Sequence, residues 1–184
     1  MYEANIRYLH HLGEVTYFSP LADTSLPDAG FVYLPGGYPE LYLAALSANR
    51  PMLQSIRRYV ENGGKLLAEC GGMMYLCDEI RDKNGDVFPM VGVLHQSATM
   101  ENMKLRLGYR TLLYNDARLK GHEFHYSRLV EQQDPLPSCA VAYTAKGVET
   151  DTPLYHYKNV WAGYTHLYWA DPAGNDWFTK FIIK

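Results

Sequence analysis

The chain has 184 residues, of which 47% are hydrophobic and 20% charged, and its formal net charge at pH 7 is −3. A chain of this length usually forms a single domain. Its slightly negative net charge gives no reason to expect binding to nucleic acid or to an anionic membrane. No apolar run approaches the roughly 20 residues of a membrane span, and the N-terminus lacks the basic-then-apolar plan of a signal peptide. The cysteines Cys70, Cys77 and Cys139 fit neither a disulfide framework nor a zinc site, so we expect reduced thiols in the cytoplasm.

The first 80 residues alternate between helical and strand patterns. A helix is predicted over 2–12, ending at Gly13, and a strand over 14–19. Further segments are a strand before Pro35-Gly36-Gly37, helices over 39–48 and 51–62, a buried strand over 65–69 and a helix over 71–80. This alternation predicts a parallel sheet covered by helices on both faces.

The second half has a different pattern. Residues 91–113, 122–130 and 139–145 indicate β structure and turns, residues 158–169 a strand leading into a loop, and residues 175–183 an amphipathic helix. A parallel α/β domain normally begins with a strand, whereas this chain begins within a helix. We therefore expect residues 1–184 to be one domain of a longer protein.

Cys70 lies between the predicted strand "KLLAE" and the glycines Gly71 and Gly72. A sharp strand-to-helix corner would present its thiol at the carboxyl edge of the sheet, where a helix N-terminus favours a thiolate and an oxyanion. The alternative is a buried, inert thiol before a turn. The loop in "YLPGGYPE" follows the neighbouring strand and would reach the same edge, where its glycines can turn a second N–H toward an oxyanion.

A thiol nucleophile needs a base. Among the seven histidines, His10 and His11 end a predicted helix, and His156 lies in a loop-like, tyrosine-rich stretch. We favour His166, at a strand-to-loop transition late in the chain, with the cluster at 122–125 second. Metal binding is the other use of that cluster, but it lacks a third ligand at a persuasive spacing.

Several blocks resemble the C-terminal glutamine amidotransferase domain of cobyrinic acid a,c-diamide synthases. They are "FVYLPGGYPELYLAAL", "GGKLLAECGGMMYL", "PMVGVL", "LGYRTL", "GHEFHYS" and "GYTHLYWA", in that order along the chain. The resemblance runs from about residue 2 to the end. It implies an α/β, flavodoxin-like class I amidotransferase fold, with a mostly parallel central sheet, helices on both faces and extra β structure in the second half.

The resemblance also implies roles for individual residues. Cys70 corresponds to the nucleophile that attacks the glutamine amide, and His166 to the catalytic base. Gly37 and Gly71 correspond to the oxyanion donors. Glu123 and His125, in "GHEFHYS", would line the glutamine site or the coupling surface.

Two positions depart from the wider class I pattern. Tyr168 stands where many of these glutaminases have the acid of a His-x-Glu pair, and Met74 stands where many have a glutamine. Both departures resemble this subfamily, which tends to work as a Cys–His dyad. The group that orients His166 is left open, with Glu123 and a backbone carbonyl as candidates, and we expect slow or partner-dependent glutaminase activity.

The resemblance implies that ammonia is passed to an ATP-activated carboxylate of a corrinoid. This chain has no G-x-x-x-x-G-K-[ST] motif, so we expect no cofactor here and expect ATP and Mg²⁺ in an N-terminal synthetase domain, without which this domain could fold or act less well. The alternatives are a nickel-sirohydrochlorin a,c-diamide synthase, a non-catalytic module that scaffolds a synthetase, and another cysteine hydrolase on a similar sheet.

Overall fold

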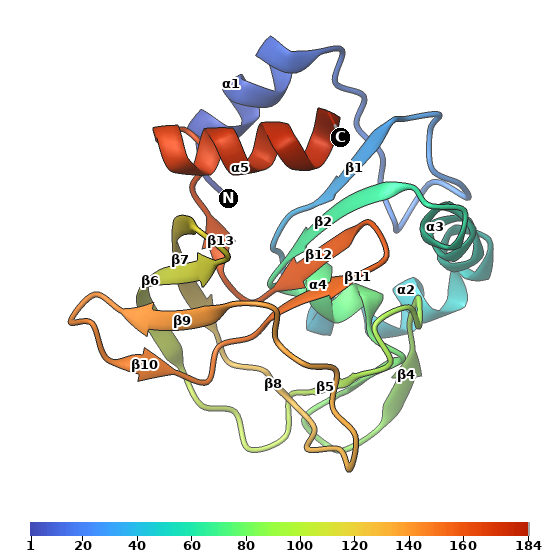
Figure 1. Ribbon diagram of the computed structural model, residues 1–184. Coiled ribbons are helices and arrows are strands. Elements are labelled where there is room, and N and C mark those ends of the chain that lie inside the picture. Colours follow the sequence, from blue (N-terminus) through green and yellow to red (C-terminus); the bar gives the residue numbers. More distant parts are fainter. Residues whose placement is uncertain (184) are drawn as a thin grey trace.

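A four-stranded sheet lies at the centre of the computed structural model, which describes residues 1–183 (Figure 1). Its strand order is β1 (Phe31–Leu34), β2 (Lys65–Glu69), β12 (Val160–Gly163) and β11 (Leu154–Tyr157). The first three strands are parallel, and β11 runs antiparallel to β12. The prediction of a mostly parallel sheet is confirmed.

Helices cover both faces of this sheet because its strands alternate their apolar side chains between two cores. Val32 and Leu34 of β1 belong to the core that also contains α2 (Leu43–Ala48), α3 (Arg50–Glu61) and α4 (Gly71–Leu76). Phe31 and Tyr33 pack against the second core, with α1 (Glu3–Leu12) and α5 (Pro172–Ile183). A short 3-10 helix, η1 (Pro39–Leu41), precedes α2.

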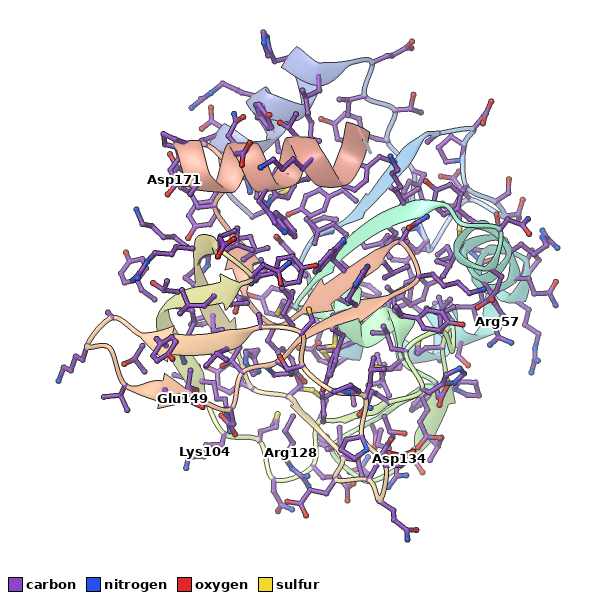
Figure 2. All side chains as sticks on the ribbon, viewed as in Figure 1. Arg57, Lys104, Arg128, Asp134, Glu149 and Asp171 are labelled. Carbon is purple, nitrogen blue, oxygen red and sulfur yellow. The ribbon has the colours of Figure 1, made fainter. Side chains whose placement is uncertain are left out.

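Local signals set the ends of two helices. Pro51 lies in the first turn of α3, as predicted, and the Asn49 side chain accepts a hydrogen bond from the Met52 N–H at 3.4 Å. Figure 2 shows Asp171 at the start of α5. The Asp171 carboxylate accepts the Gly174 N–H at 2.8 Å, and so α5 begins three residues before the predicted start.

The extra β structure of the second half forms two further sheets. The larger is antiparallel, in the order β10 (Glu149–Thr150), β9 (Val141–Thr144), β6 (Arg106–Tyr114), β7 (Ala117–His125) and β13 (His166–Leu167). The smaller contains β4 (Val87–Pro89), β3 (Glu79–Arg81), β5 (Ser97–Thr99) and β8 (Arg128–Leu129). Because β13 pairs with β7, the larger sheet reaches the carboxyl edge of the central sheet.

The strand predicted over 14–19 was wrong. Residues 14–19 have no assigned secondary structure, and they do not pair with β1, which is the edge strand of the central sheet in the described residues. Val15 to Phe18 and the residues of β1 instead line a groove of about 1020 Å³.

Two other predictions need correction. The helix predicted over 71–80 stops at Leu76, because the Asp78 N–H donates to the Gln96 carbonyl at 2.8 Å and the chain continues into β3. His156 lies in a strand rather than a loop, since β11 pairs with β12 and its ring stacks on Trp161. Within residues 1–183, no helix has both the length and the apolar character needed to cross a bilayer.

Candidate active site

Cys70 occupies the corner between β2 and α4. Its backbone has φ 50° and ψ −111°, a left-handed conformation that residues other than glycine rarely adopt and that costs about 1–3 kcal/mol. The Cys70 N–H donates to the Gly163 carbonyl of β12 at 2.8 Å, and the Met74 N–H donates to the Cys70 carbonyl at 3.0 Å. The predicted strand-to-helix corner is therefore present, with the strain of a nucleophile elbow.

The glycines after Cys70 allow two chain segments to approach closely. A Cβ on Gly72 would lie 2.2 Å from the Leu34 carbonyl oxygen, and a Cβ on Gly71 would lie 2.5 Å from the Gly37 carbonyl oxygen. The loop after β1 therefore contacts the elbow, as the parallel sheet predicts. The assignment of Gly37 and Gly71 as oxyanion donors concerns their N–H groups and stays a prediction.

The Cys70 thiol is almost completely buried, with 6% of the residue exposed. Burial is the main cause that raises its pKa to about 11, and the carboxylates of Glu40, Glu69 and Glu123 act in the same direction. A hydrogen bond from the Gly71 backbone lowers the pKa but does not offset the burial. The sulfur is therefore held as a thiol at neutral pH and needs a base to react.

A narrow pocket opens onto Cys70. It offers about 20 Å³ to the centre of a water-sized sphere, which is room for about one water molecule. Its lining includes Gly37, Tyr38, Glu40, Cys70, Met74, Phe124 and His125. A larger ligand can reach the sulfur only if the side chains around this pocket move apart.

His166 begins β13 and pairs with His122 of β7. Its ring packs against the loop after β1, since a Cβ on Gly36 would lie 2.1 Å from the His166 Cε1. The His122 ring stacks on the His166 ring with centroids 4.9 Å apart, and the His122 Nδ1 lies 2.7 Å from the Tyr2 hydroxyl. The structure thus brings His166, the predicted base, to the loop that contacts the elbow.

The acid beside His166 is Glu69, which sequence reasoning missed. The Glu69 Oε2 lies 3.6 Å from the His166 Nδ1, and this carboxylate immediately precedes Cys70 in the chain. The Tyr33 hydroxyl donates to the same Oε2 at 2.6 Å, and burial together with the Glu69 charge and this hydrogen bond raises the pKa of Tyr33. The available signal was an acidic residue ending a buried apolar strand, where a charge requires partners.

Glu123 and His125 have their main contacts away from His166. The Glu123 Oε2 pairs with the Arg110 guanidinium at 2.8 Å and lies 4.0 Å from the His125 Nε2. The His125 ring stacks on Tyr164 with centroids 3.8 Å apart and lines the pocket beside Cys70. Burial lowers the pKa of His125, so it is neutral at pH 7. The predicted role of both residues at the glutamine site stays a prediction.

The two departures from the wider class pattern have different surroundings. Met74 lines the Cys70 pocket, and its sulfur accepts a hydrogen bond from the Ser127 hydroxyl at 3.2 Å. Tyr168 packs edge-on against Tyr2, with ring centroids 5.1 Å apart. Across residues 1–183, no group of three or more His, Cys, Asp or Glu side chains is placed to hold a metal ion.

Comparison with known proteins supplies the chemical context for this site. The family of CobB/CobQ-like glutamine amidotransferase domains matches residues 1–174. The chain is 38% identical to the hydrogenobyrinate a,c-diamide synthase of Pseudomonas aeruginosa, covering 91% of this chain and 38% of that protein. It is 39% identical to the cobyrinate a,c-diamide synthase of Fusobacterium nucleatum, with the same coverage. The chain thus spans about two-fifths of the length of these relatives.

Solved structures agree on the fold. A glutamine amidotransferase crystal structure has a TM-score of 0.55 at 18% identity, covering 84% of this chain and 80% of that one. PurLQS from Thermotoga maritima has a TM-score of 0.59 at 19% identity, covering 89% of this chain and 80% of that one. At these identities the likeness concerns the fold alone. With the family match over residues 1–174 and the fold in agreement, the chain belongs to the CobB/CobQ-like glutamine amidotransferase domain family.

Proposed function

We propose that this chain hydrolyses glutamine to glutamate and ammonia, with Cys70 as nucleophile and His166 as base. The observation that carries the proposal is the strained corner at Cys70, which opens onto a pocket beside the loop that packs against His166. Strain of this kind persists only where the surrounding structure enforces it, and it is found preferentially at functional positions. The family membership supports glutamine as the substrate.

The chemistry follows from the residues present. His166 takes the thiol proton as the Cys70 sulfur attacks the amide carbon of glutamine, forming a C–S bond and a tetrahedral oxyanion. N–H groups of Gly37 and Gly71 would stabilise that oxyanion. Collapse of the intermediate breaks the C–N bond, and the imidazolium gives its proton to the departing ammonia. Water, activated by His166, then hydrolyses the thioester to glutamate and restores the thiol.

We further propose that the ammonia serves an ATP- and Mg²⁺-dependent synthetase region, which amidates the a and c carboxylates of cobyrinic or hydrogenobyrinic acid. The names of the relatives, and the larger part of their length that lies outside the matched region, support this. Tyr38, Phe124 and Tyr126 line the Cys70 pocket yet are 59%, 41% and 42% exposed. Exposed aromatic side chains around a pocket favour contact with a partner surface.

We place this reaction in the cytoplasm. Cys70, Cys77 and Cys139 are all free thiols, and unpaired cysteines of this kind are typical of a reducing compartment.

Labelling with a diazoketone analogue of glutamine tests the proposal. We expect one label per chain, on Cys70, and none in Cys70→Ser. His166→Ala should reduce the labelling rate by about 10²-fold or more, since loss of a general base costs that much. Cys77 and Cys139 serve as internal controls, because they are thiols of the same chain that do not lie at the corner between β2 and α4. Label on either of them, or an unlabelled Cys70, would contradict the proposed function.

A further inference from the structure

The carboxylate of Glu69 is fixed by two hydrogen bonds from different elements. Its Oε1 accepts the backbone N–H of Leu167 at 3.0 Å, and its Oε2 accepts the Tyr33 hydroxyl at 2.6 Å. Only 1% of the residue is exposed. A buried carboxylate without such donors would be strongly destabilising, so this arrangement holds Glu69 in one orientation.

That orientation places Oε2 beside the ring of the proposed base. The His166 Nδ1 lies 3.6 Å from the Glu69 Oε2, is buried, and has no hydrogen-bond partner among the residues that the structure describes. Gly36 and His122 pack against the same ring and limit its rotation. Hydrogen bonds of a resting active site are often long and shorten when the substrate binds.

Glu123, the other acid near the site, is already paired. Its Oε2 forms an ion pair with the Arg110 guanidinium at 2.8 Å, and its Oε1 accepts the Thr165 hydroxyl at 3.4 Å. The charge of Glu123 is therefore directed toward β6 rather than to His166.

We propose that Glu69 is the positioning residue that orients His166, taking the part that the acid two residues after the histidine plays in a His-x-Glu pair. With the His166 Nδ1–H donated to Glu69, the lone pair of Nε2 is free to accept the Cys70 proton, and the carboxylate stabilises the resulting imidazolium. The hydrogen bond to the Leu167 N–H links this acid to the residue that follows the base. Glu69, the last residue of β2, is therefore adjacent in the chain to the nucleophile Cys70 and hydrogen-bonded to the residue that follows the base. The inference rests on the proposed glutaminase reaction.

Glu69→Gln in the 184-residue chain tests this inference. The Gln side chain keeps the size and can still accept the Leu167 N–H, but its NH2 group would donate to the His166 Nδ1 and leave the proton on Nε2. We expect kcat for glutamine hydrolysis to fall by about 10²-fold or more, because the wrong histidine tautomer cannot accept the thiol proton. KM should change less than about threefold, since Glu69 does not line the pocket. Nitrogen-15 NMR of the His166 ring should show the proton moving from Nδ1 to Nε2.

Controls separate positioning from folding. Glu69→Asp keeps the charge and should recover part of the lost kcat, whereas Glu79→Gln, remote from the site on β3, should match the wild type. A wild-type kcat or an unchanged His166 ring signal in Glu69→Gln would overturn the inference. A wild-type chain whose Cys70 is not labelled by the glutamine analogue would instead refute the proposed function, and the ring signal would still test the contact between Glu69 and His166.

Discussion

Gly36 and His166 are in contact so close that only a hydrogen atom fits between the Gly36 Cα and the imidazole ring. A methyl group on Gly36 would lie 2.1 Å from the His166 Cε1 and 3.0 Å from its Nε2. The loop after β1 therefore prevents the His166 ring from moving toward it, although the two residues are 130 positions apart in the chain. Position 36 requires glycine because a larger side chain would collide with the His166 ring. Backbone conformation is not the reason, since Gly36 does not have a positive φ angle.

Gly36→Ala should therefore displace the His166 ring. We expect kcat for glutamine hydrolysis to fall by roughly 10²-fold, because a displacement of about 1 Å at a catalytic group costs that much. Gly30→Ala is a matched control, since nothing lies within 4 Å of the position that its new methyl group would take, and it precedes the same strand. A Gly36→Ala variant with wild-type kcat would show that catalysis does not depend on contact between the His166 ring and Gly36.

The raised pKa of Cys70 predicts a slow reaction with a simple alkylating reagent at neutral pH. With a pKa of about 11, roughly one thiol in 10⁴ is ionised at pH 7 in the absence of glutamine. The rate of alkylation by iodoacetamide should therefore rise about tenfold per pH unit between about pH 7 and 9.5, without a plateau. Cys70→Ser gives the background from the other two thiols. A plateau below pH 8 would contradict the prediction.

Glu40 carries a half-buried carboxylate in the pocket beside Cys70, and burial raises its pKa. Glutamine brings an α-ammonium group, and a carboxylate in a partly dehydrated pocket would bind that cation. We expect Glu40→Gln to raise KM for glutamine by about tenfold or more with a smaller change in kcat. Steady-state kinetics checks this, with Glu14→Gln as an exposed control. A decrease in kcat with an unchanged KM would indicate that Glu40 acts in the chemical step rather than in substrate binding.

One half-buried and one buried histidine predict that the fold loses stability in mild acid. Burial lowers the pKa of both His122 and His125, so in the folded chain they resist protonation, while in the unfolded chain they bind a proton near pH 6.5. The unfolded state then binds more protons, and the free energy of unfolding should fall as the pH drops from 7 to 5. Urea denaturation across this range measures the slope. His125→Gln should flatten it, whereas His10→Gln, on an exposed position of α1, should not.

Local patterns predicted most of the elements that build the site. The apolar run before Cys70, the glycines after it and Pro51 in the first turn of α3 each act through neighbours in the chain, and each prediction was confirmed. The strand predicted over 14–19 was wrong because an alternating pattern forms a strand only when it pairs with another strand, and this segment does not pair with the neighbouring edge strand β1. The same reason limits every strand prediction made from one segment alone.

The sequence by itself determined the strand-to-helix corner at Cys70, because backbone conformation there depends on a strand, a turn and two glycines that are adjacent in the chain. Only the tertiary structure decided which acid stands beside His166. Glu69 and His166 lie 97 positions apart and meet because β2 and β12 are parallel neighbours, while β13 returns to the same edge. Glu123 lies nearer in sequence and was one of the two candidates, beside a backbone carbonyl, but it is paired with Arg110 on β6. A charged side chain interacts with the groups that lie nearest to it in space, and the order of the strands in the sheets determines which residues those are.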